Sequence, residues 1–65
     1  MNIEIIENIA AGEKRYLSTS QACMCALALC RPDLLPNGMT ATQAWRRIDD
    51  VQLAAILEWA RRVAA

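Results

Sequence analysis

The sequence predicts an all-α fold, a compact bundle of three to four short helices that forms a single domain over residues 1–65. Apolar residues recur with a helical period through residues 49–65, which is typical of an amphipathic helix. Three segments begin with the same helix-capping pattern. Only one short stretch could form a strand, and no second strand is present to pair with it.

The amino-acid composition argues against three classes of protein, namely disordered chains, dedicated nucleic-acid binders and membrane-spanning proteins. Hydrophobic residues make up 55% of the chain, which argues against disorder, and seven basic residues balance seven acidic ones. Zero net charge removes the long-range attraction expected of a dedicated nucleic-acid binder. The longest apolar run, Ala22 to Cys30, is far below the roughly 20 residues that cross a bilayer, so no membrane association is expected.

The first predicted helix covers Met1 to Gly12, with Ile5, Ile6 and Ile9 on one side. Gly12 suits the left-handed conformation that ends many helices. Isoleucine also favours strands, so a strand over residues 2–6 stays the alternative, although the helix is preferred.

Three further helix starts share one signature, a capping side chain placed three residues before a glutamine. The pairs are Ser18 with Gln21, Thr40 with Gln43, and Asp49 with Gln52. In such a capping box each side chain hydrogen-bonds the other residue's backbone amide. The pattern predicts helices over residues 19–31, over residues 41–47, and from residue 49 to the end. Residues 31–39, which contain both prolines and Gly38, form the longest predicted loop.

The second and fourth helices are expected at the centre of the bundle. Residues 22–30 carry no polar side chain beyond thiols, so the second helix is either central or faces something outside the domain. The fourth helix should bury one stripe against it, and that stripe consists of Leu53, Ile56, Leu57, Ala60, Val63 and Ala64.

The cysteines predict a reduced, cytoplasmic chain. Cys23, Cys25 and Cys30 are odd in number and lie on one predicted helix, where none of them can reach another to form a disulfide. Glu4 and Glu7 near the N-terminus also argue against a secretory signal. Cys23 and Cys30 are expected to be buried structural thiols, while Cys25 points the opposite way and is free to be more reactive.

The sequence contains few residues that could carry out catalysis or bind a metal ion. The chain has no histidine, so the commonest general base and metal ligand is missing, and a cysteine nucleophile would lack its usual partner. Glycine-rich phosphate loops are absent. No enzyme activity, cofactor or metal site is therefore expected.

Two arginine pairs support one alternative, a nucleic-acid-binding regulator of helix-turn-helix type. Arg46 and Arg47 end the third helix, and Arg61 and Arg62 end the fourth. Asp49 and the residue after it stand where a recognition helix would meet the groove, and their charges would repel phosphate. The preferred explanation of the arginines is that they complement the helix dipoles, and that Glu58 pairs with Arg62 one turn later.

The preferred function is a non-enzymatic protein-binding module, a small regulator or inhibitor that occupies a partner's surface or dimerises. An apolar surplus on the second helix and two tryptophans suggest a surface made for another protein or for a second copy. The residues expected at this surface are Ala22, Cys25, Ala28, Leu29, Trp45, Trp59 and Arg62.

Overall fold

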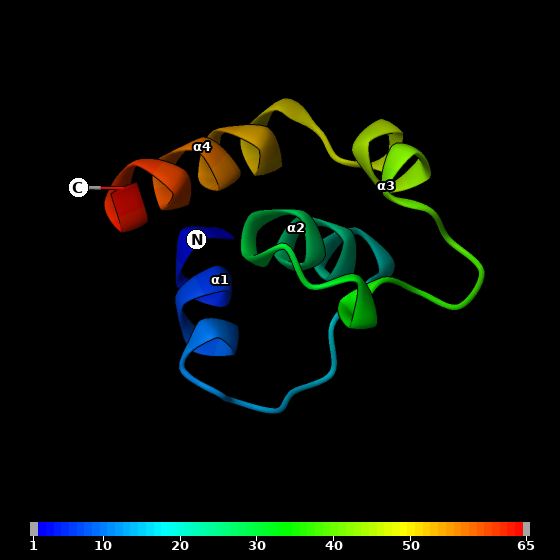
Figure 1. Cartoon of the computed structure of the whole chain (residues 1–65), viewed down its shortest axis with the longest axis horizontal. Helices are drawn as coiled ribbons and strands as arrows, with labels where there is room; N and C mark the ends of the chain where they lie inside the picture. The colour runs from blue at the N-terminus through cyan, green and yellow to red at the C-terminus, as the bar shows by residue number, and fades with distance from the viewer. Residues whose placement is uncertain (1, 65) are drawn as a thin grey trace.

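The computed structural model describes residues 2–64 and contains four α-helices and one short 3₁₀ turn (Figure 1). In chain order these are α1 (Asn2–Ala10), α2 (Thr19–Leu29), η1 (Pro32–Leu34), α3 (Ala41–Arg47) and α4 (Asp50–Ala64). No strand occurs among these residues, so the all-α prediction is confirmed and residues 2–6 belong to a helix.

The centre of the fold is α2, which packs against α1, α3, α4 and η1. In Figure 1 it lies in the middle of the molecule, with α4 above it and α1 below it to the left. Four successive residues, Cys23 to Ala26, are buried, which requires neighbours on every side of the helix. This environment explains why α2 is apolar all round.

The main core cluster joins three helices. Ile6 and Ile9 of α1 meet Met24 and Cys25 of α2, and α4 adds two further buried residues, Ala55 and Ile56. Trp59 packs against the edge of this cluster and is half-buried. On the other side of α2, the fully buried Ala44 anchors α3.

The predicted buried stripe of α4 is wrong in part. Its buried residues are Gln52, Ala55 and Ile56, whereas Leu53 and Leu57 are 37% and 55% exposed. The helix is thus rotated about its axis relative to the prediction, and it covers α2 and α1 instead of sharing the centre. Apolar side chains occupy more than one arc of this helix, so periodicity alone did not identify the arc that turns inward.

All three predicted capping boxes are confirmed. Ser18 Oγ accepts from the Gln21 amide, and Thr40 Oγ1 accepts from the Gln43 amide. In each case the glutamine Oε1 accepts from the cap residue's amide in return. At α4 the Asp49 carboxylate accepts from the amide of Gln52 at 2.8 Å, and the Gln52 side chain accepts from the Asp49 amide at 3.1 Å.

Replacing Thr40 with alanine should lower the free energy of unfolding by about 0.5–2 kcal/mol, because it orphans an amide at the start of α3. Thr42 provides the control, since it is exposed on the same helix and takes no part in the box. Urea denaturation followed by circular dichroism should show the loss for Thr40→Ala only. Equal losses in both variants would mean that the cap contributes nothing.

Two helices end in the left-handed conformation. Gly12 has φ 97°, its amide bonds the Ile9 carbonyl, and the next amide bonds the Asn8 carbonyl, as the predicted cap requires. The second helix ends at Leu29 and does not reach residue 31, because Cys30 adopts φ 54° there. The following proline restricts the residue before it and prevents further helix.

No helix within residues 2–64 is both long enough and apolar enough to cross a membrane.

Candidate protein-binding surface

The predicted surface on α2 is largely covered. Cys25 has no exposed area, so its assignment to a partner-binding surface is wrong for this conformation. Ala28 and Leu29 are half-buried and pack against the core cluster, and Ala22 is half-buried as well. The apolar surplus predicted on α2 is covered because α1, α3, α4 and η1 each pack against part of this helix.

The two tryptophans have different environments. Trp59 packs on the core cluster and fills the space beside it, which is the common structural role of a tryptophan. Trp45 on α3 is 47% exposed. Of the two, Trp45 therefore has the larger exposed fraction available to a partner.

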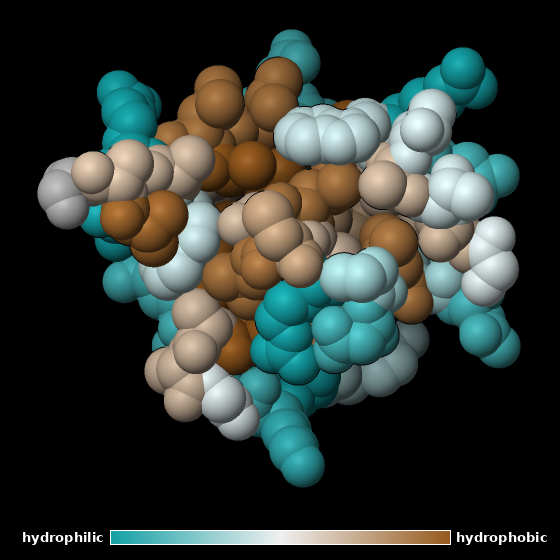
Figure 2. Space-filling view, in the orientation of Figure 1, coloured by the Kyte–Doolittle hydropathy of each residue, from teal (hydrophilic) through white to brown (hydrophobic). Residues whose placement is uncertain are grey.

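The apolar surplus lies on α4. Its solvent side carries a row of four exposed residues spaced by four, three and four positions, which places them along one face of the helix. We call this row the outer stripe; it consists of Leu53, Leu57, Ala60 and Ala64. Figure 2 shows hydrophobic side chains gathered over α4 and continuing below it onto the C-terminal half of α2.

The residues of the outer stripe were predicted from the sequence to be buried in the core. One signal could have separated the two arcs of α4, namely the position of Gln52. Its side chain must fold back on the Asp49 amide to complete the capping box, and in the structure this residue is only 7% exposed. Viewed down the axis of α4, the arc of residues centred on Gln52 includes Ala55 and Ile56 and leaves out Leu57.

One ion pair joins the C-terminal part of α4 to α1, and a second lies within α4. Arg62 lies 3.2 Å from a carboxylate oxygen of Glu7 and 3.7 Å from one of Glu58. Glu58 and Arg62 thus form an ion pair one turn apart on α4. Arg62 therefore has a structural partner on another helix, which makes it a poor candidate for a partner-binding residue.

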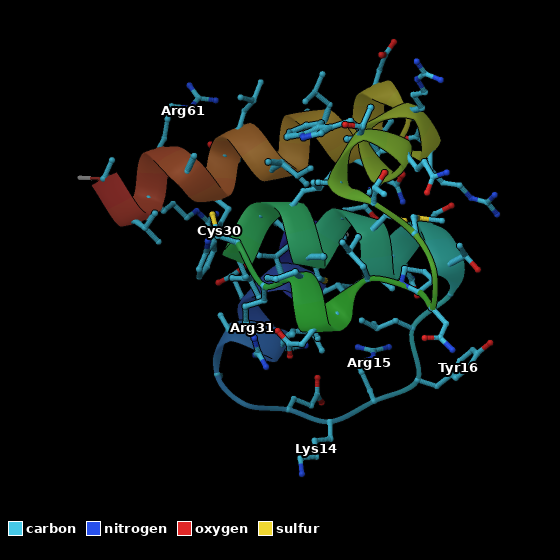
Figure 3. The ribbon with its side chains drawn as sticks, turned by 45° about the vertical axis from the view of Figure 1, so that its right-hand side comes forward. Lys14, Arg15, Tyr16, Cys30, Arg31 and Arg61 are labelled. Carbon is cyan, nitrogen blue, oxygen red and sulfur yellow. The ribbon has the colours of Figure 1, made fainter. Side chains whose placement is uncertain are left out.

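Arg61 is oriented differently. Its guanidinium lies 3.4 Å from Glu58, but 78% of its side chain is exposed. Figure 3 shows it pointing away from the body of the molecule. This cation is accessible beside the outer stripe.

The two arginine pairs do not form one basic surface. Arg46 and Arg47 lie on α3, while Arg61 and Arg62 lie near the far end of α4, and Figure 1 shows these at opposite ends of the longest dimension, 33 Å. The second pair is also next to carboxylates. The structure therefore separates the residues that the nucleic-acid alternative needed to combine.

The thiols differ in exposure. Cys23 and Cys25 are fully buried, and the thiol of Cys23 lies 3.2 Å from the Met39 sulfur. Burial raises the pKa of Cys23, and it raises the pKa of Cys25 to about 11 even though the positive charge of Arg15 acts in the opposite direction. Both are protonated, unreactive groups near neutral pH.

The predicted burial of Cys30 is wrong, and so is the outward-facing placement of Cys25. Cys30 is exposed because it lies past the end of α2 in the left-handed position, where its side chain leaves the helix surface (Figure 3). Cys25 is buried because α1 and α4 cover its side of the helix.

A surface pocket of about 430 Å³ lies beneath the loop that joins α1 to α2. Ile9, Leu17 and Leu34 form its apolar lining, and the cationic side chains at its rim are Lys14, Arg15 and Arg31. In Figure 3 Arg15 points toward α2 and η1, while Lys14 points into solvent. Each arginine has a nearby carboxylate, at 3.9 Å from Glu13 for Arg15 and at 2.9 Å from Asp33 for Arg31, which offsets much of the positive charge.

Within residues 2–64 no three histidine, cysteine or acidic side chains are grouped so that they could hold a metal ion. Comparison of the chain with protein-family models, curated proteins and solved structures finds no match.

Proposed function

We propose that the chain is a non-enzymatic protein-binding module whose binding surface is the outer stripe of α4. The observation that carries the proposal is the exposure of Leu53 and Leu57 on a helix whose neighbouring arc, with Ala55 and Ile56, is anchored in the core. The stripe would act by covering a partner's apolar surface or by pairing with a second copy.

The exposed apolar residues of the outer stripe are neighbours, and this supports a binding role more strongly than their exposure alone. Single exposed apolar residues are normal on soluble proteins, but a contiguous patch usually marks an interaction site. Leu53 and Leu57 are one turn apart on α4, and hydrophobic side chains gathered over this helix continue toward α2 (Figure 2). The alanines of the stripe add no bulk, so a partner helix could approach closely along this side.

Nucleic-acid binding is the weaker candidate. Phosphate contacts need cations that act together, and the two arginine pairs are at opposite ends of the molecule. The N-terminus of α4 also carries Asp49 and Asp50, which would repel phosphates at the point where a recognition helix reads bases.

Affinity capture from the native host tests the proposal with matched baits. Leu57→Arg places a charge in the stripe at a position that is already 55% exposed. Val51→Arg is the control, because Val51 is 67% exposed on the same helix but lies on the side that faces α1. We expect the parent and Val51→Arg to retain the bound protein, and Leu57→Arg to lose it.

Capture that is unchanged by Leu57→Arg would overturn the proposal. So would retention of DNA by the parent chain with a steep dependence on salt, since that behaviour reports phosphate contacts. Circular dichroism of each bait should show unchanged helicity, because both substituted side chains are exposed.

A further inference from the structure

We propose that the occupant of the outer stripe is a second copy of this chain, with the two α4 helices antiparallel about a two-fold axis that passes close to Leu57. This inference rests on the proposed function and specifies its partner. A two-fold interface requires a surface that is complementary to itself. The outer stripe has this property in both its shape and its charges.

The stripe is suited in shape to an antiparallel copy of itself. Leu57 is the middle residue of the 15-residue helix α4, with Leu53 one turn before it and Ala60 one turn after it. When the helix is reversed about Leu57, the larger side chain of Leu53 lies against the small Ala60 and Ala64 of the other copy. Large residues facing small ones allow two helices to interdigitate at close distance.

The charges beside the stripe select the antiparallel orientation. Asp50 and Arg61 are eleven residues apart, which is close to three full helical turns, so both lie on the same flank of the stripe. In an antiparallel pair, each flank faces the same flank of the other helix. The carboxylate of Asp50 then lies within about one turn of the Arg61 guanidinium of the second copy, and the symmetry repeats this contact.

A parallel pair offers no such match. There, each flank faces the opposite flank of the other helix, so Asp50 and Arg61 of the two copies would lie on different sides of the pair. Parallel packing would also align the two helix dipoles unfavourably. Arg61 can accept a second carboxylate, because 78% of its side chain is exposed despite its contact with Glu58.

Mixed charge-reversal variants test this arrangement. The chain with Asp50→Arg has two cations on the flank, and the chain with Arg61→Asp has two anions. Each variant alone should dimerise about tenfold more weakly than the parent, because the contacts become repulsive. An equimolar mixture should form a heterodimer of nearly parental affinity, because both contacts then join a cation to an anion, one as in the parent and one with its signs exchanged.

The control mixes Asp50→Arg with Arg46→Asp, which carries the same change of charge on α3, away from the stripe. Because Arg46→Asp keeps the parental flank, only one of the two contacts in that heterodimer is attractive, so its affinity should lie between that of Asp50→Arg alone and that of the parent. Sedimentation velocity over a concentration series, with one variant fluorescently labelled, measures each dissociation constant. If mixing the two flank variants restores nothing, the antiparallel arrangement is wrong.

A cross-link provides a second test that does not depend on altered charges. In a Cys30→Ser background, Leu57→Cys should form an interchain disulfide on mild oxidation, because the two-fold axis brings the two thiols together. Val51→Cys, on the other side of α4, should not. The reverse result would place the interface on the other face and overturn the proposal.

The oligomeric state of the parent separates this inference from the proposed function. A parent that stays monomeric at all concentrations overturns the inference. If Leu57→Arg nevertheless abolishes capture of a different protein, the stripe is a binding surface and only the identity of its partner is wrong. If capture is also insensitive to Leu57→Arg, both proposals fail.

Discussion

Replacing Met24 with alanine should lower the free energy of unfolding by about 2–5 kcal/mol, the usual cost of removing a long buried side chain from a packed core. Met24 has no exposed area and lies in the cluster that joins α1, α2 and α4. Methionine and alanine both favour helices, so the loss reports packing and the cavity left behind. For a chain of this length, total stability is about 3–10 kcal/mol, so this single change removes much of it.

Chemical denaturation at low protein concentration, followed by far-ultraviolet circular dichroism, measures the loss. Val51→Ala is the control, because Val51 is 67% exposed and its truncation should change stability by no more than about 0.5 kcal/mol. Equal stability of Met24→Ala and the parent would mean that α2 is not the centre of the core.

Asparagine should be strongly destabilising at Cys25 and harmless at Cys30. Cys25 is fully buried in the core cluster, where an amide would be larger than the thiol and would lack water to bond with. Overpacking and the unpaired polar group together should cost about 2–5 kcal/mol. This expectation reverses the one drawn from the sequence, in which residue 25 faced outward and residue 30 was buried.

Cys30 provides the matched control because it is exposed and has φ 54°, a left-handed conformation that asparagine tolerates better than most residues. Cys30→Asn should therefore be neutral or slightly stabilising in the same denaturation assay. Thiol labelling of the native parent should modify Cys30 rapidly and the other two cysteines only on unfolding. Tolerance of Cys25→Asn, or rapid labelling of Cys25, would contradict the packing of α2.

The local signals in the chain determined its helices. Each capping box depends on two side chains three residues apart, and Gly12 ends α1 through its own backbone freedom, so neither feature needs distant contacts. For this reason the starts of α2, α3 and α4 could be predicted from the sequence. The end of α2 could not, since a non-glycine residue, Cys30, adopts the left-handed conformation there.

The position of the candidate surface depends on how α4 is rotated about its axis and on which helices cover α2. The chain carries more apolar side chains than the core of the bundle requires. The prediction placed this surplus on α2, because that helix is apolar on every side. In the structure, neighbours from every side bury the middle of α2, while α4 keeps Leu57 in solvent. An apolar pattern in a sequence indicates how much apolar surface the chain carries. It does not show which helix will cover that surface.

The helical fold, the three capped helix starts and the apolar surplus follow from local hydrogen bonding and composition, so they can be predicted from the amino-acid sequence. The burial of Ala55 and Ile56 on α4, with Leu53 and Leu57 exposed, depends on how the helices pack. The rotation of a helix is set by the shapes of the surfaces it meets, and those surfaces are assembled from residues far apart in the chain.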